Sequence, residues 1–169
     1  EPTRAKSSYQ PHSVGLLNRL EYPSTIICNL NIFDFNIVLE KSSEAIAEID
    51  KYPRPIKKQQ PNYHTKNNCT WYVHNKRNQT KRYLPSSFTD AKNWLNEAKR
   101  AGFATGKKPI AGSILQTSKG GDGYGHVAFV EKVNKNGSIK ISEYNYNVRL
   151  GYGTRTLTKK QASQYNYIY

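Results

Sequence analysis

The stretch Gly125-His-Val-Ala-Phe-Val-Glu-Lys-Val-Asn134 is followed directly by Lys135-Asn-Gly-Ser-Ile-Lys-Ile-Ser-Glu143. Both runs are rich in residues that favour strands, and the Asn136-Gly137 pair between them is a strong signal for a tight hairpin turn. We therefore predict two antiparallel strands, over residues 126–133 and 138–143. Pairing about this turn places His126 opposite a residue near 143–147, at one end of the sheet.

Polar side chains gather at that end of the predicted hairpin. Glu143 and Asn145 point to the same face because side chains alternate with a period of two along a strand. One ring nitrogen of His126 can then be held by Glu143 or Asn145, while the other faces a thiol. A nucleophile, a base and an orienting residue in this order carry out covalent acyl transfer.

Cys69 is the candidate for that thiol. It follows Asn68 and precedes residues 70–78, which we predict to form a helix. At a helix N-terminus, with His126 nearby, the pKa of Cys69 should be depressed and the thiolate favoured. Backbone N–H groups at the same helix start can stabilise the oxyanion of a tetrahedral intermediate. Cys28, in an apolar run, is expected to pack in a core instead.

A second helix is predicted after Asp90, with Trp94 on its apolar stripe and Gly102 just past its end. The glycine-rich loop over residues 119–125 lacks the G-x-x-x-x-G-K-[ST] order of a phosphate cradle. We expect it to form a flexible rim beside a substrate cleft, with Tyr124 as a contact.

Several other polar and aromatic residues are expected to have no part in the chemistry, or only a minor one. Trp71 is expected to be mainly a core residue that also shapes the cleft. His12, His64, His74 and the strand residue Glu131 are expected to face solvent.

Four motifs together resemble one known family. They are Asn-Asn-Cys-Thr-Trp-Tyr-Val at 67–73, Pro-Ile-Ala-Gly-Ser-Ile at 109–114, the stretch at 125–134, and Gly-Ser-Ile-Lys-Ile-Ser-Glu-Tyr-Asn-Tyr at 137–146. In this order they resemble the CHAP domain, the cysteine- and histidine-dependent amidohydrolase/peptidase family, and above all staphylococcal secreted and phage cell-wall hydrolases.

The resemblance implies a papain-like α+β fold in which N-terminal helices pack on an antiparallel β-sheet. It also implies site roles: Cys69 as the nucleophile, His126 as the base, Glu143 as the orienting residue and Asn145 as a supporting one. Asn68, Trp71 and Tyr124 are the predicted substrate-binding or oxyanion residues. Family members often carry Gln where this chain has the shorter Asn68.

No metal and no cofactor is expected. Some phage members of the family bind calcium through an acidic loop ahead of the cysteine, but residues 59–68 contain no carboxylate. No Cys/His spacing indicates zinc.

Two parts are predicted along the chain. We recognise no family motif in residues 1–60. We interpret them as an N-terminal arm with one or two strands over Thr25–Leu39, a short helix over Glu44–Lys51, and a basic, proline-rich connector. Residues 61–169 form the predicted catalytic domain.

The charge balance points to a polyanionic surrounding. The chain has 26 Lys and Arg against 12 Asp and Glu, a net charge of +14, which suits nucleic acid, anionic lipid or a teichoic-acid-rich wall. Because the basic residues are scattered, we expect no specific nucleic-acid binding. No run is apolar and long enough to insert into a membrane. The chain contains no Met, so we expect either a removed signal peptide or a larger parent polypeptide.

The sequence therefore predicts a cysteine peptidoglycan hydrolase, either an N-acetylmuramoyl-L-alanine amidase or a cross-bridge or stem endopeptidase. We expect it outside the cell or in the cell wall, as a secreted bacterial enzyme or a phage virion component. Its expected partners are peptidoglycan and, beyond it, anionic teichoic acids or a virion assembly. The alternative is a catalytically inert basic module that binds cell wall or nucleic acid, which would leave the complete set of site residues unexplained.

Overall fold

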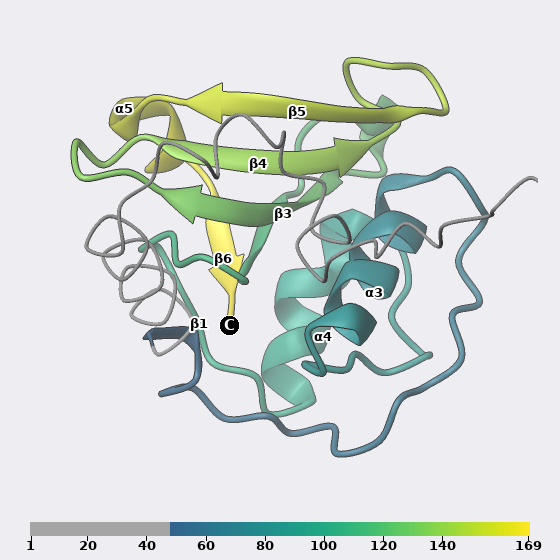
Figure 1. The fold of residues 1–169 in the computed structure, drawn as a ribbon. Helices are drawn as coiled ribbons and strands as arrows, with labels where there is room; N and C mark the ends of the chain where they lie inside the picture. Colours follow the sequence, from purple (N-terminus) through teal and green to yellow (C-terminus); the bar gives the residue numbers. More distant parts are fainter. Residues whose placement is uncertain (1–47) are drawn as a thin grey trace, which may run out of the picture. The chain divides into compact units, whose positions relative to one another are not determined.

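The computed structural model of this protein describes residues 48–169. The helical elements are α3 (Cys69–Gln79), the 3-10 turn η2 (Ala91–Asn93), α4 (Trp94–Arg100), the 3-10 turn η3 (Gly121–Gly123) and α5 (Lys159–Ala162). The two longest helices, α3 and α4, precede the long strands in the chain (Figure 1). The helices predicted after Asn68 and after Asp90 are both present.

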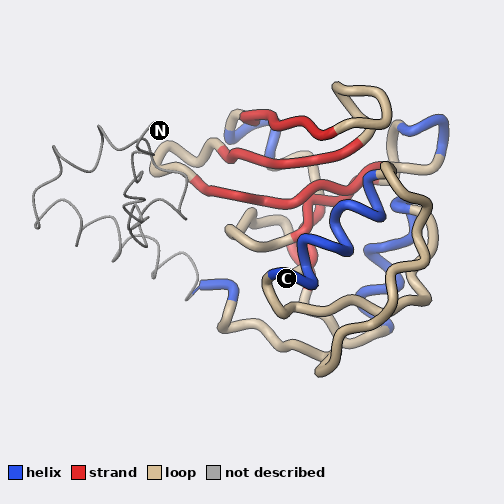
Figure 2. The backbone as a smooth tube through the Cα atoms, turned by 45° about the vertical axis from the view of Figure 1, so that its right-hand side comes forward, coloured by secondary structure: helices blue, strands red, loops and turns tan. Residues whose placement is uncertain are grey.

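Six strands form one antiparallel sheet in the order β1-β6-β2-β3-β4-β5. Their bounds are β1 (Thr105–Gly106), β2 (Ile114–Thr117), β3 (His126–Val133), β4 (Ile139–Tyr144), β5 (Tyr152–Leu157) and β6 (Asn166–Ile168). Helices α3 and α4 lie side by side along one part of this sheet (Figures 1 and 2). The predicted α+β architecture, with helices on an antiparallel sheet, is confirmed.

The predicted hairpin is the β3–β4 pair. Its turn residue Gly137 has a φ of +80° and its N–H donates to Asn134 O at 2.9 Å. Phe129 pairs with Ser142, and the register shifts beyond Val130. The strong turn signal and the β-rich flanks thus specify this hairpin, which brings the start of β3 next to the end of β4.

Each face of the sheet carries its own apolar core because side chains alternate along the strands. Val127 packs with α3 and α4, whereas its neighbour Ala128 packs with the opposite core. The helix-side core is Val73, Leu84, Phe88, Ala91, Trp94, Ala98, Phe103, Ile114, Val127 and Ile168. The other core is Ile49, Ile110, Leu115, Ala128, Val130, Ile139, Ile141, Leu157, Ala162, Tyr167 and Tyr169.

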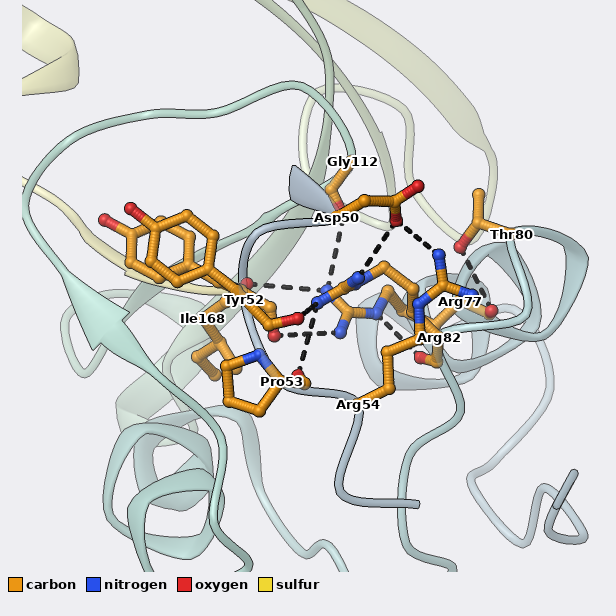
Figure 3. Close-up of polar contacts among 10 residues, drawn as sticks. Asp50, Tyr52, Pro53, Arg54, Arg77, Thr80, Arg82, Gly112 and Ile168 are labelled. Atoms are coloured by element: carbon orange, nitrogen blue, oxygen red, sulfur yellow. Dashed lines mark hydrogen bonds and ion pairs between the residues drawn. The ribbon is translucent and has the colours of Figure 1, made fainter. Parts of the chain in front are cut away.

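A buried arginine anchors helix α3 to the sheet (Figure 3). The guanidinium of Arg77 has no solvent exposure and donates to four backbone carbonyls. These belong to Arg82 at 2.8 Å, Gly112 at 3.2 Å, Ile168 at 3.4 Å and Tyr169 at 3.1 Å. One side chain therefore ties α3 to β6 and to the turn before β2.

A second arginine joins the segment before α3 to the same region. Arg82 donates to the Asp50 carboxylate at 3.3 Å and to the Tyr52 and Pro53 carbonyls at 3.1 and 3.3 Å. Asp50 also forms an ion pair with Arg54 (Figure 3). Residues 50–54 thus bind to the chain that follows α3.

Two predictions of solvent-facing side chains are wrong. His74 is fully buried and its Nε2 lies 3.3 Å from Gln60 O, because residues 60–64 fold back over α3. His64 is half-buried, 5.5 Å from the Trp94 ring, and burial followed by the proximity of His74 lowers the pKa of His64 to about 4.

Glu131 is not a simple solvated residue either. Its carboxylate binds Lys76 Nζ at 2.7 Å and accepts a hydrogen bond from Ser142, which in turn accepts one from Tyr72 OH at 2.7 Å. This polar chain connects α3 to β3 and β4.

Some predictions lie outside the described residues. These are the strands over residues 25–39, Cys28 and His12. Of the helix predicted over 44–51, residues 48–51 are described: 48 and 49 are helical, whereas 50 and 51 form a turn. The division of the chain at residues 60 and 61 stays a prediction. Within residues 48–169, no helix has the length and apolar character needed to cross a membrane.

Candidate active site

Cys69 is the first residue of α3, directly after the N-cap residue Asn68. Its side chain is half-buried, and His126 together with the backbone N–H groups of Thr70 and Val127 acts to lower the pKa of the thiol. Burial opposes ionisation of the thiol, but the hydrogen bond and charge of His126 outweigh it, and the pKa of Cys69 lies below its ordinary value. The two predicted reacting groups therefore meet, and their contact favours the thiolate.

His126 begins strand β3 and is only 3% exposed. Its Nε2 lies 2.8 Å from Glu143 Oε2, so Nδ1 is the ring nitrogen left for the Cys69 thiol. Burial alone would lower the pKa of His126, but the hydrogen bonds and negative charges of Cys69 and Glu143 raise it above its ordinary value. A thiolate beside an imidazolium is the charge state that these contacts stabilise.

Glu143 lies near the end of β4 and is 1% exposed. Arg155 of β5 binds both of its carboxylate oxygens, through Nε to Oε1 at 2.6 Å and through Nη2 to Oε2 at 2.9 Å. Burial acts to raise the pKa of Glu143, but the hydrogen bonds of His126 and Arg155 prevail and hold it below the ordinary value. The carboxylate is thus ionised and held from two sides.

Asn145 lies close to the predicted nucleophile but does not contact the imidazole. Strand β4 ends at Tyr144, and Asn145 has a φ of +53°, so the alternation that would align it with Glu143 stops there. Its Nδ2 donates to Asn68 Oδ1 at 3.0 Å, and its Oδ1 accepts from Leu150 N at 2.8 Å. Of the two candidates for holding His126, Glu143 is the one in contact.

The three residues predicted to bind substrate or the oxyanion differ in their surroundings. Asn68 makes no side-chain cap on α3 but binds Asn145. Trp71 is half-buried with its ring 5.7 Å from that of Tyr144. Tyr124 is 61% exposed, two residues before His126, and its ring lies 5.6 Å from Lys92 Nζ.

Two residues of the site escape prediction from the sequence. Arg155 comes from a strand that no motif marks, although the alternation in 152–157 is a weak strand signal. Tyr146 follows Asn145, and its ring lies 4.6 Å from the His126 ring and 4.0 Å from the Arg155 guanidinium. Aromatic residues are so frequent in this chain, with 13 Tyr, that a single Tyr carries little signal.

The arrangement suits acyl transfer by a sulfur nucleophile. It combines a thiol of lowered pKa, a base in hydrogen-bond contact and a carboxylate that orients the base. Among residues 48–169, no group of three or more His, Cys, Asp or Glu side chains is placed to hold a metal ion.

Gly125 is expected to be essential for placing His126. It has a φ of +78°, and a Cβ there would lie 2.6 Å from both Lys92 N and Thr117 O, which are backbone atoms unable to yield. We expect Gly125→Ala to lower the free energy of unfolding by about 1–3 kcal/mol, as measured by urea denaturation. We also expect it to lower the rate of substrate turnover, because His126 is displaced. Gly120→Ala is the matched control, since it shares a positive φ but has open space around it. Equal losses in the two variants would contradict the steric argument.

Similar proteins share this region of the chain. The chain is 45% identical over 109 residues to the staphylococcal secretory antigen SsaA of Staphylococcus epidermidis, an alignment that covers 64% of this chain and 40% of that relative. It is 43% identical over 113 residues to the secretory antigen ssaA2 of Staphylococcus aureus, covering 64% of this chain and 39% of the relative. The chain thus spans well under half the length of these curated relatives.

A solved structure has the same fold. It is a crystal structure of an N-acetylmuramoyl-L-alanine amidase from Staphylococcus aureus, with a TM-score of 0.57 and 35% identity, covering 60% of this chain and 30% of that one. The family model of the CHAP domain matches residues 58–145, which include Cys69, His126 and Glu143. On these grounds the chain belongs to the CHAP domain family.

Proposed function

We propose that this protein is a peptidoglycan hydrolase that cleaves amide bonds with Cys69 as its nucleophile. The observation that carries the proposal is the buried imidazole of His126, whose Nε2 is held by Glu143 at 2.8 Å and whose hydrogen bonding and charge lower the pKa of the Cys69 thiol at the start of α3. Burial, hydrogen bonds and charges shift the pKa values of Cys69, His126 and Glu143 together.

The proposed reaction has two halves. The Cys69 thiolate attacks the amide carbonyl carbon, and the proton on His126 Nδ1 passes to the leaving amine nitrogen as the C–N bond breaks. A thioester to Cys69 remains. His126 then takes a proton from water, the resulting hydroxide attacks the thioester carbonyl, and the thiolate leaves as the carboxylic acid forms. Glu143 stays ionised throughout and holds the imidazole in place.

The oxyanion of each tetrahedral intermediate needs hydrogen-bond donors. We assign this role to the N–H of Cys69 at the free start of α3 and to the side-chain amide of Asn68. Asn145 supports the proposal because it binds Asn68 Oδ1 at 3.0 Å, which leaves Asn68 Nδ2 to donate. One such donor contributes about 2.7–4 kcal/mol to transition-state stabilisation where it has been measured.

The relatives support the substrate and the location. An N-acetylmuramoyl-L-alanine amidase shares the fold at 35% identity, and the matched relatives are named secretory antigens. We therefore place the protein outside the cell, acting on cell-wall peptidoglycan in lysis or remodelling. Its net charge of +14 suits a wall rich in anionic teichoic acids. The scissile bond is either the muramoyl–L-alanine amide or a peptide bond of the stem or cross-bridge.

Purified Gram-positive peptidoglycan tests the proposal. Amide hydrolysis releases new free amino groups and no new reducing sugar ends, so both are to be measured over time. Mass spectrometry of defined muropeptides then identifies the bond. An amidase frees the intact stem peptide, a stem endopeptidase leaves part of the stem on the muramoyl group, and a cross-bridge endopeptidase leaves the whole stem there. New reducing ends without new amino groups, or neither product, would contradict the proposed function.

A further inference from the structure

Arg155 provides most of the support for the Glu143 carboxylate. Oε1 of Glu143 accepts from Arg155 Nε at 2.6 Å, and among the described contacts this is its only partner. Oε2 is shared between His126 Nε2 at 2.8 Å and Arg155 Nη2 at 2.9 Å. A buried carboxylate oxygen without a partner is costly, so removal of the guanidinium would leave Glu143 free to turn or to take up a proton.

The register of β4 and β5 explains how Arg155 reaches this position. Glu143 pairs directly with Gly153, which has no side chain, and Ile141 pairs with Arg155. The long Arg155 side chain therefore extends along the diagonal to reach the Glu143 carboxylate.

Tyr146 closes a ring of contacts around the base. The Arg155 Cζ atom lies 4.0 Å from the centre of the Tyr146 ring, and that ring lies 4.6 Å from the His126 ring. His126, Glu143, Arg155 and Tyr146 thus contact one another in sequence, with Glu143 at Nε2 of the imidazole and the Tyr146 ring beside it at an interplanar angle of 38°.

We propose that Arg155 is a positioning residue, whose planar guanidinium fixes the orientation of the Glu143 carboxylate and, through Glu143 and Tyr146, that of the His126 imidazole. The proposal rests on the proposed function only in taking His126 as the base. A guanidinium suits the task because its fork binds both oxygens of a carboxylate at once, whereas an ammonium binds from a single point.

Three variants test the role of Arg155. Arg155→Gln removes the fork and the charge, Arg155→Lys keeps the charge alone, and Arg149→Gln is the matched control. Arg149 is exposed in the same β4–β5 connection and takes part in no salt bridge among the described residues. Thermal unfolding of each variant reports the folded fraction to which every rate is normalised.

The first readout is turnover of a soluble muropeptide. For Arg155→Gln we expect kcat to fall by about 10- to 100-fold with little change in KM, the scale of a misplaced catalytic group. Arg155→Lys should recover only part of this loss, and Arg149→Gln should match the wild type. A wild-type kcat in Arg155→Gln, or full recovery by Lys, would overturn the role of the fork.

The second readout does not need peptidoglycan. The rate of Cys69 alkylation by iodoacetamide is measured against pH, with the Cys69→Ala protein giving the background from Cys28. A less firmly held imidazole stabilises the thiolate less, so in Arg155→Gln the onset of fast alkylation should move to higher pH, by about one unit. A shift to lower pH would show that Arg155 acts by charge repulsion on His126 and would overturn the proposal.

The two readouts separate this inference from the proposed function. If wild-type protein releases no amines from peptidoglycan but the alkylation profile still moves in Arg155→Gln, the function fails and the positioning role stands. If peptidoglycan is cleaved and Arg155→Gln is indistinguishable from the wild type in both assays, the positioning role alone fails.

Discussion

Cys69→Ala is expected to abolish release of amino groups from peptidoglycan, lowering turnover by at least about 10³-fold. The reason is that Cys69 stands at the start of α3 and His126 lowers the pKa of its thiol, which makes this side chain the nucleophile of the proposed reaction. A Ser at position 69 should not restore turnover, because its hydroxyl has too high a pKa for the imidazole to hold it ionised. Turnover per folded molecule, on a soluble muropeptide, is the measurement.

The fold should survive this change. Cys69 is half-buried, the substitution removes a single sulfur atom, and Ala favours a helix more than Cys does. The thermal unfolding midpoint is therefore expected to stay close to that of the wild type. Cys28→Ala is the matched control, since it removes the same thiol at a position predicted to lie in a core, and it should keep its turnover. Full activity of Cys69→Ala would remove the basis of the proposed mechanism.

The part of the site that the sequence predicts is the part encoded by local signals. The Asn136-Gly137 turn fixes which strands pair, and the pairing brings His126 and Glu143 together over 17 residues. Cys69 follows from its place before a helix that the sequence also marks. Each step needs only a turn signal, the period of the side-chain alternation and the number of residues between the two positions.

The part that the sequence does not predict depends on contacts made by the assembled fold. Arg155 lies diagonally across from Glu143 only because β5 pairs with β4 in one register, and no turn signal comparable to Asn-Gly fixes that register. Asn145 departs from prediction because its positive φ ends the alternation. His74 is buried by residues 60–64, which the sequence predicts only as connector and loop.

Helix α3 shows the same limit in its buried face, which includes His74 and Arg77 beside Val73. An amphipathic reading of the sequence assigns such polar residues to solvent. They are buried because they bind backbone carbonyls of other segments. Only folding brings those carbonyls close to α3, so the sequence alone does not reveal these partners. Arg77 is the clearest case.

Arg77→Met is expected to be the most destabilising substitution outside the site. It leaves the carbonyls of Arg82, Gly112, Ile168 and Tyr169 without the donors that now satisfy them. Burial, followed by the nearby Arg82 and Arg54, lowers the pKa of Arg77 to about 9, so it is still protonated at pH 7, and four of its five N–H donors bind these carbonyls. Since each unsatisfied buried group costs about 1–3 kcal/mol, we expect a loss of about 3 kcal/mol or more in the free energy of unfolding.

Urea denaturation of three variants measures this loss and its origin. Arg100→Met removes the same group from the exposed end of α4 and should change the free energy of unfolding by less than about 0.5 kcal/mol. Arg77→Lys keeps a charge but donates from one point, so it cannot reach carbonyls on three separate segments and should recover little. If Met at position 77 proves as stable as the wild type, the gain from no longer burying a charge offsets the lost hydrogen bonds. In that case the apolar cores, and not the guanidinium, hold the helix that presents Cys69.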